Sequence, residues 1–197
     1  MAAERSLVLV SGPSRSGKSR WAEHLAQQSG RPVLYLATGP DAEHDPSWSA
    51  RVALHRQRRP SHWQCREVGA ELVAVLAELN QPDGPQNATL LIDSLGTWVA
   101  WFLEEATPQW QERCKRLQQQ LQGQNQPVLL VVEETGWGVV PATAVGGRIE
   151  VTRRTLANSF PTVKMTAPGT PPAGGAERTL EFRQIAPGLG QAVVDVD

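Results

Sequence analysis

A short run near the start of the chain has the residue types and spacing of a phosphate-binding loop. Residues 12–19 read G-P-S-R-S-G-K-S, directly after an apolar segment and directly before one of helical composition. In a G-x-x-x-x-G-K-S loop, successive backbone N–H groups surround phosphate oxygens at a helix N-terminus, where the helix dipole favours anions. The ammonium of Lys18 would bridge the β- and γ-phosphates, and the hydroxyl of Ser19 would bind Mg²⁺. The run therefore predicts a nucleoside triphosphate site.

All eight residues of this loop are candidate nucleotide contacts, and Lys18 is also a catalytic candidate. Pro13 has no N–H, so its position cannot donate to a phosphate oxygen. The same pattern arises by chance in unrelated sequences, but the strand pattern before it and the helix pattern after it favour the functional interpretation. The eight residues are Gly12, Pro13, Ser14, Arg15, Ser16, Gly17, Lys18 and Ser19.

Carboxylates end two apolar strand patterns and are candidate magnesium ligands. Asp93 ends the run A-T-L-L-I-D, and Glu133 and Glu134 end the run V-L-L-V-V-E-E. A carboxylate at the end of a buried strand holds Mg²⁺, directly or through water, in P-loop proteins. Each of the three could instead cap a nearby backbone group. We favour Asp93 over the glutamate pair, so that Ser19 and Asp93 form the predicted metal site.

A histidine on a basic helical segment is the candidate nucleophile. Arg51, His55 and Arg59 are spaced four residues apart, so they share one face of a helix that we predict from Pro46 to near Arg59. Neighbouring cations keep an imidazole neutral, which is its nucleophilic form. A neutral imidazole beside bound phosphates can form a phosphoramidate intermediate. The alternative is a solvated basic helix end, in which His55 has no special role.

Strand and helix patterns alternate along most of the chain. Because strand–helix–strand units with right-handed crossovers build parallel sheets, we predict an α/β fold of the P-loop NTPase type, with a mainly parallel sheet flanked by helices. Ligands bind at the carboxyl ends of such strands, which is where the motifs fall. Predicted strands cover residues 7–10, 32–38, 88–93 and 128–134, and predicted helices cover residues 19–28, 46–59, 68–79, 95–105 and 110–121.

The overall composition argues against several classes of partner. The chain has 197 residues and a formal net charge of −1, so bulk electrostatics favour neither nucleic acid nor an anionic membrane. We find no apolar stretch long enough to span a bilayer and no signal-peptide pattern. The two cysteines, Cys65 and Cys114, are far apart in the sequence, as expected for reduced thiols. We therefore expect a cytoplasmic protein.

Five segments together resemble one family, the bifunctional adenosylcobinamide kinase/adenosylcobinamide-phosphate guanylyltransferases of cobalamin biosynthesis. Their order and spacing are much more specific than a phosphate loop alone, and the resemblance covers roughly residues 6–148. The segments are V-S-G-P-S-R-S-G-K-S-R at 10–20, L-Y-L-A-T at 34–38, A-R-V-A-L-H-R-Q-R-R-P-S-H-W at 50–63, L-I-D-S-L-G-T-W at 91–98 and E-T-G-W-G-V-V-P at 134–141.

The resemblance implies two reactions. ATP or GTP first phosphorylates the aminopropanol hydroxyl of adenosylcobinamide. GMP from GTP then passes through a histidine to adenosylcobinamide phosphate, which yields adenosylcobinamide-GDP and pyrophosphate. The family's guanylylated histidine corresponds to His55, and its Arg-Pro-x-His-Trp segment makes His62 a further site candidate. On geometry, Arg15 and Arg51 are candidate triphosphate contacts, and the resemblance also implies a homotrimer.

The end of the chain departs from the family pattern. Relatives continue with a Phe-Arg-Asp-type helix, an Asn-Gln pair and a final apolar strand, whereas residues 165–176 here are dominated by Pro, Gly, Thr and Ala. We therefore predict a kinase/guanylyltransferase domain over residues 1–148 and a divergent, replaced or frame-altered segment over 149–197, with short strands at 180–182 and 191–197. The alternative functions are another small-molecule P-loop kinase and a nucleotide-binding homologue without full activity.

Overall fold

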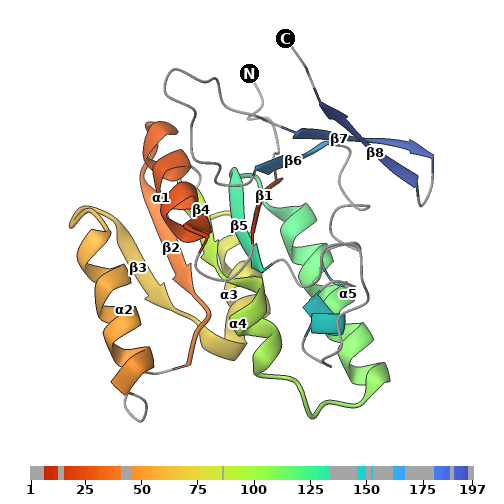
Figure 1. The fold of residues 1–197 in the computed structure, drawn as a ribbon, viewed down its shortest axis with the longest axis horizontal. Helices are drawn as coiled ribbons and strands as arrows, with labels where there is room; N and C mark the ends of the chain where they lie inside the picture. Colours follow the sequence, from red (N-terminus) through yellow and green to blue (C-terminus); the bar gives the residue numbers. More distant parts are fainter. Residues whose placement is uncertain are drawn as a thin grey trace.

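The fold is a single sheet with helices on both of its faces (Figure 1). The structure is a computed structural model that describes residues 7–12, 16–40, 46–85, 87–133, 146–149, 152, 162–166, 180–186 and 189–194. The strands in these ranges are β1 (Leu7–Gly12), β2 (Val33–Ala37), β3 (Gln64–Glu67), β4 (Thr89–Asp93), β5 (Val128–Glu133), β6 (Thr162–Thr166), β7 (Leu180–Ala186) and β8 (Leu189–Val194). The helices are α1 (Lys18–Gln28), α2 (Pro46–Arg58), α3 (Leu72–Leu79), α4 (Leu95–Ala100) and α5 (Thr107–Gly123), with a 3₁₀ turn η1 (Gly69–Glu71) before α3.

The strands lie in the order β3-β2-β4-β5-β1-β6-β7-β8. The pairings from β3 to β6 are all parallel, and β7 and β8 are added in antiparallel pairings. Because parallel strands point the same way, the ends of β1, β2, β4 and β5 meet at one edge of the sheet. The predicted α/β fold with a mainly parallel sheet is confirmed.

Side chains that alternate along the central strands face two separate cores. On β4, Leu90 and Ile92 pack in the core that contains α3, α4 and α5, whereas Leu91 packs in the core that contains α1. Strands that are buried on both faces read as continuous apolar runs rather than as alternating patterns. For this reason the four central strands could be predicted from their sequence alone.

Helix α4 is shorter than the helix that the sequence predicts over residues 95–105. It ends at Ala100, where the N–H of Trp101 bonds to the carbonyl of Trp98, three residues back rather than four (3.3 Å). The indole N–H of Trp101 donates to the carbonyl of Thr38 at 2.8 Å, across the edge of the sheet. This long-range bond is made by the residue directly after α4, and a local helical pattern cannot predict it.

Two further elements near the edge of the sheet differ from the prediction. Strand β3 was not predicted, because all four of its residues are exposed and it has no apolar pattern. It is an edge strand that pairs only with β2 among the described strands, in a register that aligns Leu34 with Gln64. The helix predicted over residues 68–79 begins as the 3₁₀ turn η1, and α3 itself starts at Leu72.

The C-terminal region continues the sheet. Strand β6 lies beside β1 in parallel register and was not predicted; its end overlaps the start of the run at 165–176 that is dominated by Pro, Gly, Thr and Ala. Strands β7 and β8 correspond to the short strands predicted at 180–182 and 191–197, with different bounds. The chain thus adds three strands on the β1 side of the sheet.

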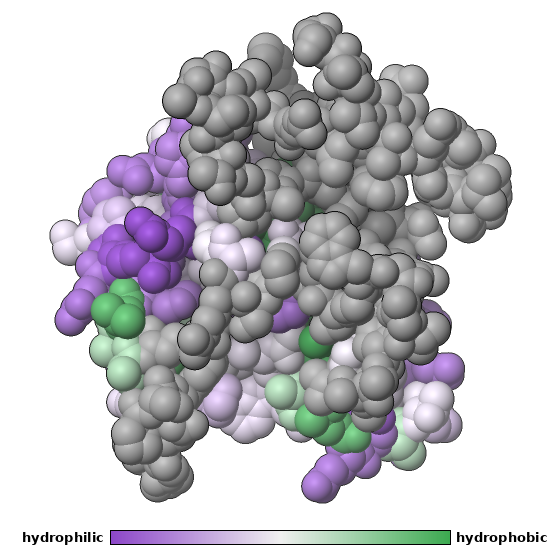
Figure 2. Space-filling view, viewed as in Figure 1, coloured by the Kyte–Doolittle hydropathy of each residue, from purple (hydrophilic) through white to green (hydrophobic). Residues whose placement is uncertain are grey.

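The surface is mostly polar on the α1 side. In the space-filling view hydrophilic side chains gather over the region of α1, and apolar side chains form small separate groups (Figure 2). Among the described residues the large apolar side chains that remain exposed are Leu54, Trp101 and Leu103. Within the same part of the chain, no helix combines the length and apolarity that crossing a membrane requires.

The fold predicts that substituting two leucines will have different effects on the free energy of unfolding. Leu90 is fully buried on β4, so Leu90→Ala should lower the free energy of unfolding by about 2–5 kcal/mol through lost burial and the cavity left behind. Leu54 on α2 is 58% exposed, and Leu54→Ala should change it by less than about 0.5 kcal/mol. Urea unfolding measures both variants, and equal effects would contradict the fold.

Candidate active site

The phosphate loop lies between the end of β1 and the start of α1, as predicted. Gly12 ends the strand and Lys18 begins the helix. Gly17 has a φ of 90°, which side-chain-bearing residues rarely adopt, so glycine is required immediately before the helix. The candidate contacts Pro13, Ser14 and Arg15 lie outside the described residues.

Two buried polar groups of the loop could bind an anion. The Oγ of Ser16 is buried and has no hydrogen-bond partner among the described residues. Lys18 is only 4% exposed, and its Nζ lies 3.8 Å from Oε1 of Glu133. Buried polar groups normally have partners, and a lone buried ammonium is costly. A phosphate oxygen between Ser16 and Lys18 would satisfy both groups.

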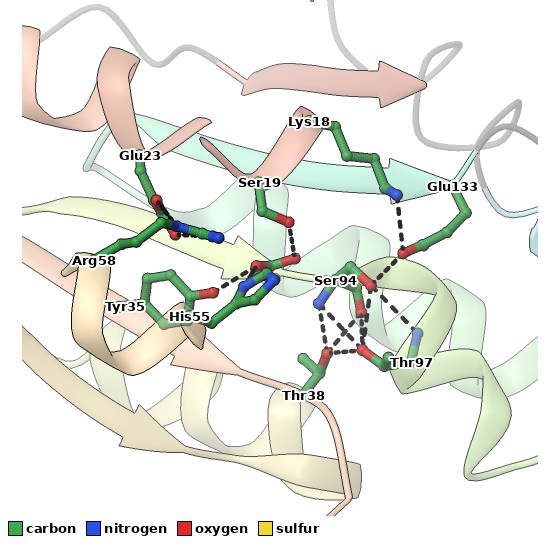
Figure 3. A network of polar contacts seen from close by, with 11 residues as sticks. Lys18, Ser19, Glu23, Tyr35, Thr38, His55, Arg58, Ser94, Thr97 and Glu133 are labelled. Carbon is green, nitrogen blue, oxygen red and sulfur yellow. Dashed lines mark hydrogen bonds and ion pairs between the residues drawn. The ribbon is translucent and has the colours of Figure 1, made fainter. Parts of the chain in front are cut away.

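Several side chains of the site contact the carboxylate of Asp93. The register of the sheet sets it beside Ala37, at the ends of β4 and β2. Ser19 Oγ donates to Asp93 Oδ1 at 3.2 Å, and the Tyr35 hydroxyl donates to Asp93 Oδ2 at 2.5 Å. Figure 3 shows Ser19, Tyr35 and His55 converging on one carboxylate. Tyr35 was not predicted as a site residue, although its position near the carboxyl end of a buried strand was the available signal.

The ionisation of this cluster follows from its contacts. Burial alone would raise the pKa of Asp93, but the neighbouring His55 imidazole and the hydroxyls of Tyr35 and Ser19 outweigh it and hold that pKa below its ordinary value. Burial, and then the charge of Asp93, raises the pKa of Tyr35 well above its ordinary range. Asp93 is therefore an anion at neutral pH, and Tyr35 remains a hydrogen-bond donor.

The predicted nucleophile faces the same carboxylate. His55 lies on α2, and its Nδ1 is 3.6 Å from Asp93 Oδ2. The guanidinium of Arg58, near the end of α2, donates to Glu23 on α1 at 3.2 and 3.4 Å, which ties the histidine helix to the helix of the phosphate loop. Arg51 lies on α2 as predicted, but its side chain is outside the described part of the structure.

Glu133 makes a second polar cluster at the adjacent strand end. Its carboxylate accepts from Ser94 Oγ and from the N–H of Gly96, both at 2.7 Å, and it also faces Lys18. Ser94 caps α4, and its own N–H donates to Thr38 Oγ1 at 2.7 Å. Of the three candidate carboxylates, Asp93 contacts Ser19 and Glu133 contacts Lys18. Glu134 lies outside the described residues.

One pocket is lined both by residues of the phosphate loop and by the predicted nucleophile. Its lining includes Lys18 and Ser19 from the phosphate loop, and His55, Asp93 and Glu133. His62 lies elsewhere: it is exposed in the turn between α2 and β3 and lines none of the described pockets. Thus the structure brings the loop, the metal candidate and the histidine together, and it leaves His62 outside.

The family comparison covers the part of the chain that contains this site. Residues 8–164 match the family model described as cobinamide kinase / cobinamide phosphate guanyltransferase. The chain belongs to this family. The match extends beyond residue 148, where the resemblance was expected to end, and it reaches into β6. It includes every described member of the candidate active site.

Relatives of known name share most of their length with this chain. It is 38% identical over 137 residues to the bifunctional adenosylcobalamin biosynthesis protein CobP of Pseudomonas aeruginosa, which covers 68% of this chain and 74% of the relative. It is 32% identical over 151 residues to the bifunctional adenosylcobalamin biosynthesis protein CobU of Escherichia coli, covering 68% and 78%.

A solved structure supports the fold alone. The crystal structure of the RadB recombinase aligns with 96% of this chain and 87% of its own, with a TM-score of 0.52 and 18% sequence identity. The cobinamide kinase family fold and this recombinase therefore share the arrangement of a parallel sheet with flanking helices.

The contact between Glu133 and Gly96 generates a prediction. A Cβ on Gly96 would lie 2.2 Å from Glu133 Oε2, so Gly96→Ala must displace this carboxylate and break its bonds to the α4 turn. We expect Gly96→Ala and Glu133→Ala each to lower the free energy of unfolding by about 1–3 kcal/mol.

The double variant identifies the mechanism of this loss. Because both changes break the same contacts, their combined effect should be well below the sum. Gly147→Ala is the matched control, because a Cβ there meets nothing within 4 Å. Chemical denaturation measures all four proteins, and full additivity of the first two would show that Glu133 does not act through Gly96.

Proposed function

We propose that this chain phosphorylates adenosylcobinamide with ATP or GTP, and then transfers GMP from GTP to adenosylcobinamide phosphate through His55. The observation that carries the proposal is the shared carboxylate: Asp93 contacts Ser19 of the phosphate loop and also faces the imidazole of His55. One bound triphosphate is then within reach of both chemistries. Family membership supplies the substrates.

For the kinase reaction, the phosphate loop holds the nucleotide. Ser16 and Lys18 offer a buried hydroxyl and a buried ammonium to the phosphates. Lys18 balances the negative charge that develops as the γ-phosphoryl group leaves the nucleotide and joins the hydroxyl of the acceptor.

Mg²⁺ fits this site as part of a nucleotide complex. Ser19 Oγ and Asp93 are adjacent oxygen donors, the type of ligand that Mg²⁺ prefers. Within the described ranges no group of three or more His, Cys, Asp or Glu residues could hold a metal by itself. Ser19 and Asp93 would therefore hold the ion together with phosphate oxygens, where it supplies charge neutralisation.

For the guanylyl transfer, Asp93 orients the histidine. An Nδ1–H directed at Asp93 leaves the lone pair on Nε2, which is the atom able to attack. Nε2 forms a bond to the α-phosphorus of GTP as the bond to the bridging oxygen breaks and pyrophosphate leaves. The imidazolium that results keeps its Nδ1 proton, and the carboxylate of Asp93 stabilises its charge. An oxygen of the acceptor's phosphate then bonds to phosphorus, and His55 leaves as neutral imidazole.

A labelling experiment tests the histidine. Incubation with GTP labelled at the α-phosphate should give acid-labile label on the protein, and His55→Ala should abolish it because the attacking nitrogen is gone. His24→Ala is the matched control, since His24 is exposed on α1 and stacks on Trp21. Phosphorylation of adenosylcobinamide without any label would favour a small-molecule kinase, and GTP binding without either reaction would favour an inactive homologue.

A binding measurement tests the phosphate loop. Lys18→Ala removes a charged donor to the phosphates, and we expect the Kd for GTP to rise roughly tenfold or more. Lys115→Ala is the control. Lys115 is exposed on α5, so this substitution removes the same charge at a site away from the loop. Isothermal titration calorimetry measures both. An unchanged Kd in Lys18→Ala would contradict the assignment of the loop.

We also propose a homotrimer in the cytoplasm as the working form. The family resemblance supports the trimer. Among the described residues both cysteines are free, Cys65 exposed and Cys114 half-buried, which suits a reducing compartment. Analytical ultracentrifugation would measure the oligomeric state.

A further inference from the structure

A second pocket adjoins the active site on the side of β3. It shares Ala37, Arg56, Arg59 and Glu67 with the first pocket, and it is otherwise lined by residues of the α2–β3 turn and of β3. None of the described residues of the phosphate loop is in its lining. A molecule in this pocket would reach the active site past the end of α2.

Most of the arginines near this pocket are already neutralised. Arg56 pairs with Glu67, and Arg66 donates two bonds to Glu78 at 2.9 and 2.7 Å. Arg59 differs from them, because in the described part of the chain it has no carboxylate partner, and its buried Nε has no hydrogen-bond acceptor. An unpaired guanidinium that borders two pockets is suited to an anion from outside the protein.

The orientation of Arg59 is fixed by an aromatic ring. Its guanidinium carbon lies 3.5 Å from the centroid of the Tyr35 ring, and the Tyr35 side chain is fully packed beneath it. The tyrosine hydroxyl is in turn held by Asp93. This cation–π contact holds the guanidinium in place, and its Nε, which has no partner among the described residues, could donate with an adjacent N–H to a bidentate anion such as phosphate.

The position of Arg59 favours the phosphate of the acceptor over the triphosphate of the nucleotide. In Figure 3, Lys18 and Tyr35 lie on opposite sides of Ser19, and it is the Tyr35 ring that Arg59 contacts. The triphosphate already has Lys18, Ser16 and Ser19. The phosphomonoester of the acceptor carries up to two negative charges and has no other unpaired cation among the described residues of the second pocket.

We propose that Arg59 binds the phosphate monoester of the acceptor and orients it toward His55 for guanylyl transfer. This inference rests on the proposed function. An acceptor oxygen held in this way bonds to the phosphorus of the histidine-bound GMP as the phosphorus–Nε2 bond breaks. The guanidinium offsets the repulsion between the two phosphates, which otherwise opposes their approach.

A two-stage experiment separates this role from nucleotide binding. The protein is first labelled with GTP carrying label at the α-phosphate and freed of nucleotide, and the label is then chased with increasing adenosylcobinamide phosphate. Arg59→Gln should change the rate of labelling much less than it changes the chase, because in this proposal Arg59 binds the acceptor and not the triphosphate. The acceptor concentration that half-saturates the chase should rise roughly tenfold or more.

Matched variants complete the design. Arg66→Gln removes an arginine from the same pocket, but one that is paired with Glu78, so its chase should resemble that of the wild type. Arg59→Lys keeps the charge but loses the planar fork, and it should fall between Arg59→Gln and the wild type. Thermal unfolding of each variant is recorded, and Arg59→Lys alone carries the test if Arg59→Gln does not fold.

The contrary outcomes are distinct. Slower labelling of Arg59→Gln with an unchanged chase overturns the inference, since Arg59 would then serve the triphosphate. Equal losses in Arg59→Gln and Arg66→Gln also overturn it, because the effect would be one of general charge. Absence of label on the wild-type protein overturns the proposed function, and this inference with it.

Discussion

The active site depends on one buried carboxylate that is shared between two helices. Asp93 accepts hydrogen bonds from Ser19 at the start of α1 and from the hydroxyl of Tyr35 on β2. It also faces His55 on α2. An isolated buried carboxylate would be strongly destabilising, so these contacts are needed for it to be charged. The same contacts bring a phosphate-loop helix and a histidine helix to one point, with Arg58 and Glu23 as a second link between them.

The parallel sheet explains why these groups can meet at all. Residues far apart in the sequence come together because β1, β2, β4 and β5 all end at one edge. Asp93 and Glu133 are at equivalent ends of β4 and β5, yet their surroundings differ: Asp93 has hydroxyls and an imidazole, whereas Glu133 has Lys18 and the cap of α4. Two carboxylates at the ends of neighbouring strands thus acquire different chemistry from the side chains around them.

The sequence was most informative where the local pattern and the tertiary environment agree. The central strands are buried on both faces, and the glycine loop has a fixed spacing, so both could be predicted. Strand β3 has four exposed residues and forms by pairing with β2. Trp101, which directly follows α4, bonds to the distant Thr38. The roles of Tyr35 and Arg59 also arise from contacts across the fold. His55 could be proposed from its spacing on α2, but only the structure supplies the carboxylate that it faces.

Two reactions at one nucleotide site require that the α- and γ-phosphates meet different groups. A phosphate loop holds the β- and γ-phosphates at the start of α1, where Ser16 and Lys18 lie. His55 comes from α2, across Asp93, so it approaches from the side of the site on which Tyr35 lies (Figure 3). Lys18 and His55 therefore come from different helices, which the shared contacts of Asp93 and the Arg58–Glu23 pair link to each other.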